Sequence, residues 1–256
     1  MEPFSSATLG RFSWRFLPEL RRFLAQTAGW DHHQWRERAA RVFKDGQGRL
    51  CVGVYSDERR PVFVKINSYR RLRKRFRSLF RPTDTEKEWT GSLAACDRGL
   101  PTPRPLAMGE QRVLGMVAET ILMFEWNANA VPLSILLDEG TTRSQRWDLA
   151  RRLGALVNNL HRNGLAHREL KASNLLWLRQ EHHLLFVDNK HLTVRSSLSE
   201  EKRIANLIRI SQMWRPRRDS GKIGRMEEYA FLIGYAGQDR GKIRRLAESI
   251  RVTNLV

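Results

Sequence analysis

The first half of the chain contains short apolar runs that predict β-strands. Residues 62–66, Val-Phe-Val-Lys-Ile, have the alternating pattern of a strand and carry one lysine, Lys65. Residues 116–124 are apolar almost without interruption, and residues 41–55 contain two strand-like segments separated by a turn with two glycines. These segments predict an antiparallel sheet.

The second half of the chain places apolar residues at helical spacing instead. Residues 142–162 gather them on one face, and residues 200–213 and 226–234 are also predicted to be helical, separated by a basic linker at residues 214–218. The apolar positions of the first of these helices are Trp147, Leu149, Leu153, Leu156, Val157 and Leu160. Strands followed by helices favour an α+β fold.

An amphipathic segment lies near the start of the chain, within residues 1–35. Pro18 suits the first turn of a short helix, and Leu17, Leu20 and Leu24 share one face of it, with arginines around them. Such a helix either lies at a membrane interface or packs on the body of the protein. The expected organisation is therefore an N-terminal extension at residues 1–35, a first lobe at 36–125 and a second lobe at 126–256.

The candidate chemistry is concentrated in one loop of the second lobe. It begins with His167-Arg168-Glu169, continues to Asn174 five residues after the acid, and is followed by Asp188 at the end of an apolar strand. This layout is typical of a kinase catalytic loop. Phosphoryl transfer needs a carboxylate to accept the proton of the attacking hydroxyl and oxygen ligands that hold Mg²⁺ on the phosphates of ATP. We therefore expect Glu169 to be the proton acceptor and Asn174 and Asp188 to be the metal ligands.

This loop departs from the usual kinase pattern at two places. Glu169 stands where an aspartate is usual, and Asn189-Lys190 follows the metal aspartate in place of Phe-Gly. A displacement of about 1 Å can reduce a rate on the order of a hundredfold. The chain is thus either an enzyme adjusted to the longer acid or a pseudokinase that binds nucleotide or a partner without turnover. Lys171 is expected near the transferred phosphoryl group, where it would stabilise developing charge.

Four further positions are expected to bind the nucleotide or to hold a group that binds it. Lys65 would contact the phosphates, and a glutamate of the helical segment at residues 85–96 would hold it there. Glu86 and Glu88 both fit this role, and Glu88 is preferred. Main-chain groups of Glu125 and Trp126, where the apolar strand ends, are expected to face the adenine at an interlobe hinge.

The composition predicts attraction to polyanions. Lys plus Arg number 46 against 27 Asp plus Glu, for a formal net charge of +19 in 256 residues. Residues 69–81, YRRLRKRFRSLFR, combine basic side chains with apolar ones at helical spacing, which favours a helix that faces an anionic membrane surface. Two cysteines make a zinc site or a disulfide framework implausible. No apolar run approaches a membrane span.

Several motifs together resemble one family. They are Phe63-Val64-Lys65-Ile66, Glu88-Trp89, Gly99-Leu100-Pro101-Thr102-Pro103-Arg104-Pro105, Leu165-Ala166-His167-Arg168, Asn174-Leu175-Leu176 and Tyr235-Ala236-Gly237. Over residues 40–245 the chain resembles the bacterial lipopolysaccharide core kinases, the Kdo/heptose kinase family. The Glu-Trp pair before the proline-rich turn discriminates best, because eukaryotic-type protein kinases do not usually carry it.

The resemblance implies a two-lobed protein-kinase-like fold, with an antiparallel sheet and a helix in the N-lobe and a mainly helical, trimmed C-lobe. It further implies phosphorylation of an inner-core sugar of lipopolysaccharide from ATP, at the cytoplasmic face of the bacterial inner membrane. The expected partners are lipopolysaccharide or a lipid-linked core oligosaccharide and the anionic membrane. An atypical protein kinase is the alternative enzyme, and the chain shows no nucleic-acid-binding module.

Overall fold

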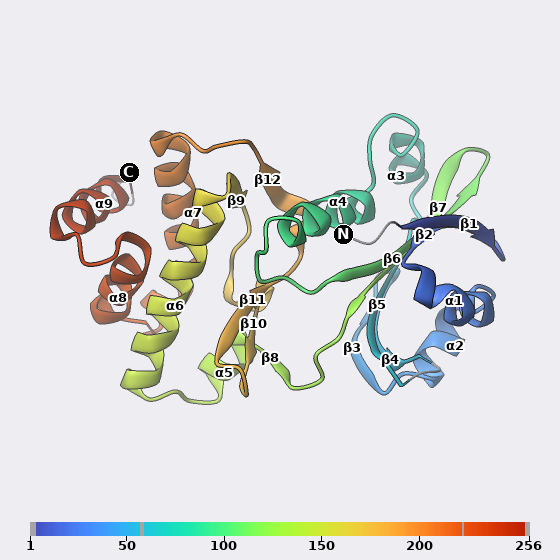
Figure 1. Ribbon diagram of the computed structural model, residues 1–256, viewed down its shortest axis with the longest axis horizontal. Helices are drawn as coiled ribbons and strands as arrows, with labels where there is room; N and C mark the ends of the chain where they lie inside the picture. Colours follow the sequence, from blue (N-terminus) through green and yellow to red (C-terminus); the bar gives the residue numbers. More distant parts are fainter. Residues whose placement is uncertain (1–3, 57–58, 222, 254–256) are drawn as a thin grey trace. The chain divides into compact units, whose positions relative to one another are not determined.

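The chain divides into two compact units, which are described separately (Figure 1). The computed structural model describes residues 4–56, 59–221 and 223–253. Unit 1 is formed by Met1–Leu93 and Pro103–Ala128, and unit 2 by Ala94–Thr102 and Asn129–Val256. Each unit is therefore assembled from two separate stretches of the chain.

Unit 1 is built on a seven-stranded antiparallel sheet in the order β1-β2-β6-β7-β5-β4-β3. Its strands are β1 (Ser5–Leu9), β2 (Phe12–Phe16), β3 (Arg41–Gly46), β4 (Arg49–Tyr55), β5 (Pro61–Ser68), β6 (Pro105–Val113) and β7 (Met116–Glu125). Its helices are α1 (Arg21–Thr27), α2 (His32–Glu37), α3 (Leu72–Arg77) and the first part of α4 (Asp84–Cys96), with a 3₁₀ turn at Pro18–Leu20. The predicted antiparallel sheet is thus confirmed.

The alternation of side chains along β5 gives the sheet two different faces. Val62, Val64 and Ile66 are fully buried on one face, in a core to which α1 and α2 also contribute. Phe63 and Lys65 point to the other face, because successive residues of a strand alternate in direction. Lys65 is therefore presented by a strand whose opposite side is fixed in the core.

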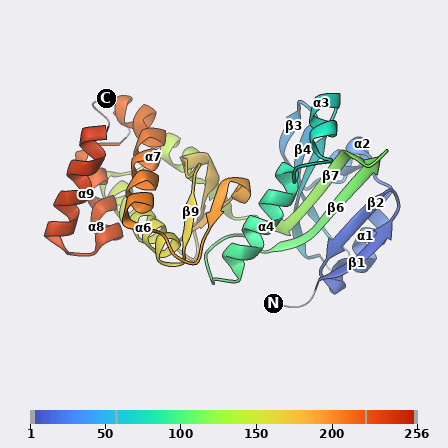
Figure 2. The same cartoon turned by 90° about the horizontal axis from the view of Figure 1, so that it is seen from above.

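The described residues of the expected N-terminal extension, 4–35, belong to unit 1. Strands β1 and β2 continue the sheet beyond β6 (Figure 2), because Phe12, Trp14 and Phe16 alternate with exposed residues and enter the core. Leu17, Leu20 and Leu24 are buried as well. Of the two alternatives for this segment, packing on the body of the protein is the observed one.

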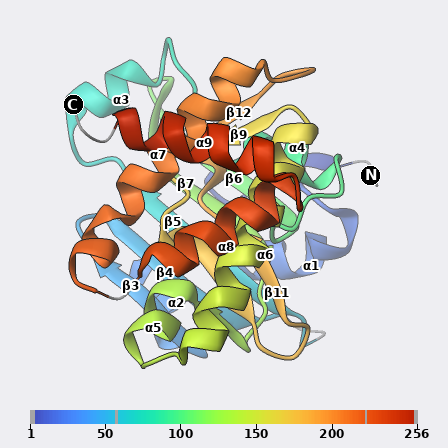
Figure 3. The ribbon, with the colours of Figure 1, turned by 90° about the vertical axis from the view of Figure 1, so that its left-hand side faces the viewer.

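Unit 2 combines two small sheets with a helical bundle. Its strands are β8 (Ala130–Pro132), β9 (Leu165–His167), β10 (Leu175–Leu178), β11 (His183–Phe186) and β12 (Leu192–Val194), in the orders β11-β10-β8 and β12-β9. Its helices are α5 (Leu133–Asp138), α6 (Arg143–Arg162), α7 (Glu200–Asp219), α8 (Arg225–Ala236) and α9 (Arg240–Thr253), with 3₁₀ turns at Ala172–Asn174 and Asn189–His191. Helices α8 and α9 lie side by side (Figure 3).

Helices α6 and α8 pack with their backbones almost in contact. A Cβ atom on Gly154 would lie 2.0 Å from the Phe231 carbonyl oxygen, and one on Gly234 would lie 1.9 Å from that of Arg151. Only glycine permits so close an approach at these two positions. Helix α6 thereby becomes a rigid support for strand β9, which follows it directly.

Two expectations for the helical region need correction. Residues 214–218 are not a linker, because α7 continues through Pro216 to Asp219. The Trp214 indole donates a hydrogen bond to the Leu170 carbonyl, which holds this part of the helix against the loop that follows β9. Helix α9 was not expected, although Ile243 and Leu246 bury one face of it.

In the described part of the chain no helix has the length and apolarity needed to cross a membrane.

Candidate active site

The loop that carries the candidate chemistry is held between two strand pairs of unit 2. Strand β9 leads into it and pairs with β12, with His167 opposite Leu192. The loop ends in β10, which pairs with β11 so that Leu175 lies opposite Phe186. Asn174 and Val187, the next residues outward, are joined by a backbone hydrogen bond of 3.0 Å. Asn174 and Asp188 therefore lie at the same end of one hairpin.

His167 is a buried, neutral crosslink beneath the loop. Its side chain is fully buried, and burial lowers the pKa of the imidazole to about 4. Nδ1 accepts a hydrogen bond of 3.2 Å from the backbone N–H of Glu169. The proton consequently sits on Nε2, which donates to the Val187 carbonyl at 3.3 Å. One imidazole thus fixes the residue that carries the candidate base and the residue before Asp188.

A second buried network supports strand β9 from the helices. His161 on α6 lies 2.8 Å from the Tyr235 hydroxyl and 2.9 Å from the Asn206 side-chain oxygen. Asn206 in turn donates to the His167 carbonyl at 3.1 Å. Burial lowers the pKa of His161. The Tyr-Ala-Gly motif is explained by this network, since Tyr235 completes it and Gly237, at φ 72°, ends α8.

Asn174 and Asp188 offer two oxygen ligands at this end of the hairpin. Asn174 is buried and donates its amide to the Glu169 carbonyl at 2.9 Å. Its Oδ1 is thereby left as the acceptor atom of the side chain. Asp188 adopts a left-handed conformation, φ 65° and ψ 51°, which is costly for a residue that is not glycine and typical of functional positions.

These residues fit a magnesium ion bound mainly through nucleotide phosphates. Mg²⁺ prefers hard oxygen ligands and is usually held by one or two carboxylates together with phosphates and water. Asp188 and Asn174 supply such oxygens. Among the described residues no group of three His, Cys, Asp or Glu side chains is placed to hold a metal by itself. A site completed by phosphate oxygens is therefore consistent with the donor set.

Lys190 and His191, which follow Asp188 in the chain, each contact an acidic side chain of the site. His191 Nε2 lies 3.3 Å from Glu169 Oε1, and Lys190 Nζ lies 3.2 Å from Asp188 Oδ2. Glu169 is about one-third exposed, and Lys171 beside it is exposed. Sequence reasoning missed both His191 and Lys190 as site residues. The signal available was that Lys190 stands in the pair that replaces the usual Phe-Gly, with His191 directly after it.

The proline-rich turn before β6 supports the same hairpin. The Pro101 carbonyl accepts from the N–H of Phe186 at 3.0 Å, and the Thr102 hydroxyl donates to the Phe186 carbonyl at 2.8 Å. The same hydroxyl accepts a hydrogen bond of 2.9 Å from the buried side chain of Asn189. Asn189, next to Asp188, is therefore held by the turn rather than by apolar packing.

In unit 1, Lys65 and Glu88 form a close ion pair. Lys65 Nζ lies 2.6 Å from Glu88 Oε2, and both side chains are nearly buried. Glu86, the competing candidate, instead lies 3.8 Å from Arg15 at the surface. The structure thus brings Lys65 together with the preferred glutamate.

The expected hinge groups are engaged within unit 1. The backbone N–H of Glu125 donates to the Arg104 carbonyl, and that of Trp126 donates to the Pro61 carbonyl. The Glu125 carboxylate pairs with Arg60 at 3.0 Å. Both N–H groups are therefore already used within unit 1, and the contact of these main-chain groups with an adenine stays a prediction.

The Trp126 side chain joins an aromatic cluster that sequence reasoning missed. Its ring lies over Gly53, where a Cβ atom would be 2.7 Å from it. Phe43 contacts both Trp126 and Phe63, with ring centroids 6.0 and 5.4 Å apart, and Tyr55 lies 5.7 Å from Trp126. Phe63 is two residues before Lys65, so the cluster lies on the same face of the sheet as the Lys65–Glu88 pair.

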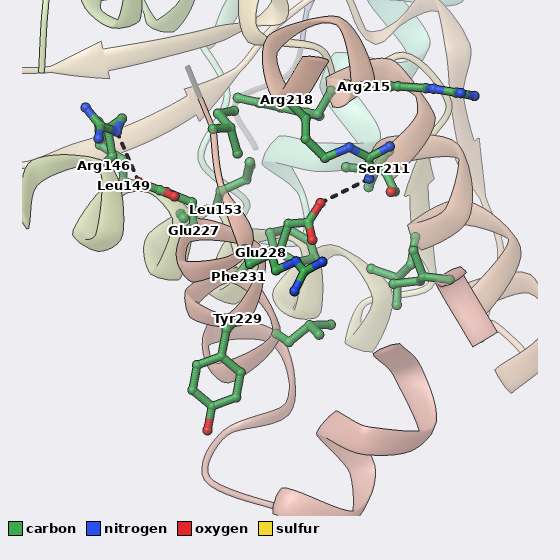
Figure 4. A pocket seen from close by; sticks show the side chains of 18 of the residues that line it. Arg146, Leu149, Leu153, Ser211, Arg215, Arg218, Glu227, Glu228, Tyr229 and Phe231 are labelled. Atoms are coloured by element: carbon green, nitrogen blue, oxygen red, sulfur yellow. Dashed lines mark hydrogen bonds and ion pairs between the residues drawn. The ribbon is translucent and has the colours of Figure 1, made fainter. Parts of the chain in front are cut away.

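A separate apolar cavity of about 490 Å³ lies within the helices of unit 2 (Figure 4). Leu149, Leu153 and Phe231 are among its apolar lining residues. Charged pairs also line it, and the figure shows Arg146 with Glu227 and Arg218 with Glu228, at 3.0 and 3.1 Å. Its volume falls within the range of about 300–1,000 Å³ that is usual for ligand pockets.

The fold and the loop geometry define a protein of the kinase class, and comparison with solved structures agrees. A structure of WaaP in complex with acyl carrier protein is 17% identical in sequence, covers 90% of this chain and 96% of that chain, and has a TM-score of 0.56. A rhoptry antigen kinase domain of Toxoplasma gondii is 12% identical, with coverages of 84% and 82% and a TM-score of 0.47. The likeness to WaaP confirms the expected two-lobed kinase-like fold.

The family follows from the sequence itself. Residues 33–229 match the lipopolysaccharide kinase (Kdo/WaaP) family, and the chain belongs to that family. It is accordingly a phosphotransferase of the lipopolysaccharide kinase type, as the resemblance of its motifs implied. A comparison with curated proteins finds no match.

Proposed function

We propose that this protein transfers the γ-phosphoryl group of ATP to a sugar hydroxyl of the lipopolysaccharide inner core, at the cytoplasmic face of the inner membrane. The observation that carries the proposal is the loop of unit 2, in which neutral His167 holds the Glu169 backbone and Val187, the residue before Asp188, while Asn174 binds the Glu169 carbonyl. Family membership supports the acceptor class. The net charge of +19 suits an acidic, phosphate-bearing glycolipid.

In this proposal Lys65 contacts the nucleotide phosphates and Glu88 keeps its ammonium group in position. Asp188 and Asn174 would hold Mg²⁺, which when bound neutralises the phosphates that react. In the described structure Lys190 pairs with Asp188 and supplies a positive charge at that carboxylate. We propose that the aromatic cluster around Trp126 provides the stacking surface for the adenine, since it shares the sheet face of Lys65.

Glu169 accepts the proton of the attacking sugar hydroxyl in this mechanism. Its carboxylate oxygen beside His191 is oriented by that contact, while its backbone is fixed through His167 and Asn174. The longer side chain is thus anchored at both ends, which offsets the additional freedom of one methylene. Exposed Lys171, two residues later, is placed to stabilise charge that develops on the transferred group.

The test is transfer of labelled phosphate from ATP to extracted lipopolysaccharide by the purified protein. Transfer that depends on Mg²⁺ and is lost in Glu169→Gln, with ATP binding retained, is the expected result. Labelling of protein substrates instead of the glycolipid would favour an atypical protein kinase. ATP binding without transfer to any acceptor, unchanged by Glu169→Gln, would establish the pseudokinase alternative.

We further propose that unit 2 binds an acyl carrier protein. The specific observation is the apolar cavity among α5 to α9, which suits an acyl chain and has arginines in its lining. The structurally similar WaaP was solved in complex with acyl carrier protein. A large apolar cavity with charged groups along its wall is the form expected of a site for an amphipathic group.

Paired variants on α6 test this partner. Ala150 lines the cavity, whereas Ala155 on the same helix is exposed and does not. Long-chain acyl carrier protein should raise the melting temperature of the native protein and of Ala155→Phe, and Ala150→Phe should lose the effect. Equal binding of acyl carrier protein with and without its acyl chain would contradict a role for the cavity.

A further inference from the structure

A basic and apolar surface of unit 1 extends well beyond helix α3. The helix buries none of its own side chains, and Leu72, Phe76 and Phe80 are 71%, 59% and 76% exposed. Leu114, at the tip of the β6–β7 hairpin, is 89% exposed. We call residues 70–81 together with Val113 and Leu114 the basic–apolar surface.

The helix and the hairpin tip are physically joined. The Ser78 hydroxyl accepts a hydrogen bond of 2.9 Å from the backbone N–H of Val117. A Cβ atom on Gly115 would lie 3.4 Å from the Leu79 side chain, so that leucine contacts the turn. The Phe76 and Phe80 rings lie 5.6 Å apart. The exposed apolar groups therefore form one surface supported by the sheet.

Leu114 is unfavourable for the isolated fold in two respects. The hairpin is closed by Val113 opposite Met116, and the two turn residues between them have φ values of 52° at Leu114 and 77° at Gly115. A two-residue turn with both φ values positive prefers Asn-Gly, because a leucine side chain is strained in the left-handed region. A strained leucine that is also exposed contributes little to folding, which points to an external contact.

Basic side chains surround this apolar surface. The exposed ones are Arg70, Arg71, Arg73, Lys74, Arg77 and Arg81. None of the six forms an ion pair with another residue that the structure describes. Glu110 and Glu119, the acidic residues of the adjoining strands that lie nearest the hairpin turn, are paired with Arg112 and Arg11. The surface consequently keeps a strong positive charge.

We propose that the basic–apolar surface docks unit 1 on an anionic phospholipid bilayer, with Leu114, Leu72 and Phe80 entering the interface and the arginines contacting lipid phosphates. The most exposed apolar side chain of the surface, Leu114, is aliphatic, as is Leu72, and neither can stack on bases, which favours the headgroup–acyl boundary over nucleic acid. The inference deepens the proposed function, because an acceptor carried by the membrane would then be approached from a fixed side.

Vesicle flotation with the 256-residue chain tests the surface without any kinase reaction. The native protein should bind vesicles that contain about one-third phosphatidylglycerol and should not bind pure phosphatidylcholine. Leu114→Asn should weaken binding roughly tenfold while leaving the melting temperature equal or higher, since asparagine suits the turn. Arg73→Gln with Arg77→Gln should weaken it roughly 25-fold, at about fivefold for each charge.

The matched control is Arg240→Gln with Arg245→Gln. These substitutions replace two exposed arginines of α9 in unit 2, and they lower the net charge by the same amount as the first pair. This pair should bind vesicles nearly as well as the native protein. Equal losses in the two double variants would reduce the effect to overall charge and overturn the proposal. Unchanged vesicle binding by Leu114→Asn would also overturn the proposal. So would an RNA-binding assay in which the variants of the basic–apolar surface lose RNA binding while they still bind vesicles. Phosphate transfer to a detergent-solubilised acceptor should be normal in Leu114→Asn. The kinase assay and the vesicle assay can therefore fail independently, and each result tests only its own proposal.

Discussion

Lowering the pH should destabilise this protein through His167, the imidazole that fixes the catalytic loop. Its pKa is lowered from 6.5 to about 4 by burial, so the unfolded chain binds a proton that the folded chain refuses. The corresponding stability is fully present above about pH 6.5 and is lost as the pH falls through the interval down to the folded pKa. The interval of 2.5 pH units, 6.5 minus 4, is equivalent to roughly 3 kcal/mol in total. Roughly 2 kcal/mol of this should disappear between about pH 7 and pH 5.

The measurement is the free energy of unfolding in urea at a series of pH values, for the native protein and for His167→Gln. Carboxylates with lowered pKa values, such as Asp148 and Glu227, and the buried His161 also destabilise the fold at low pH in both proteins. The difference between the two slopes therefore isolates His167. The native protein should show the steeper loss.

A direct titration guards against a variant that does not fold. The imidazole resonances of His167 in the native protein should not titrate above about pH 5. Protonation near its ordinary value, or parallel pH slopes for the native protein and His167→Gln, would refute the neutral crosslink. The orientation of the Glu169 backbone by an accepting Nδ1 would then be untenable as well.

Three further predictions concern catalysis. Asp188→Ala should lower phosphate transfer more than about a hundredfold with an unchanged melting temperature; near-normal turnover in the folded variant would remove the mechanism. Glu169→Gln should lower turnover by roughly 10²–10⁴ with little change in ATP affinity, and Glu169→Asp should stay partly active; native rates in Glu169→Gln would disprove proton acceptance. Glu88→Gln should lower transfer by roughly tenfold or more, since the Lys65 ammonium loses its anchoring charge, whereas Glu86→Gln, which disrupts only a surface pair, should be nearly normal. Equal rates in the last two variants would refute the preference for Glu88.

The parts of the site that could be read from the sequence are those set by spacing along the chain. Glu169 and Asn174 are five residues apart on one loop, and Lys65 lies on a strand whose alternation is visible. A single β10–β11 hairpin then brings Asp188 to the same end. These are local relations, and local periodicity is what a sequence pattern reports.

The parts that could not be read depend on contacts between distant residues. Thr102 and Asn189 are 87 positions apart, yet they share a hydrogen bond beside Asp188. Residues 12–16 alternate as a strand, but only the short helix that begins near Pro18, and no strand before it, was predicted from the sequence. Residues 12–16 form strand β2 because they pair with β6, more than ninety residues later, and such a pairing leaves no local signal in the sequence.

The division of each unit into two stretches of chain has a consequence for how the protein is made. During synthesis, β2 emerges long before its partner β6, so the sheet of unit 1 cannot close until residues past 105 have left the ribosome. Residues 94–102 are by then already outside, yet Ala95 and Leu100 belong to the core of unit 2, which is still to be translated. Cutting the gene at residue 128 would therefore not yield two equivalent halves. The upstream fragment would contain every strand of unit 1, whereas the downstream fragment would lack part of its own core and the turn that holds Asn189.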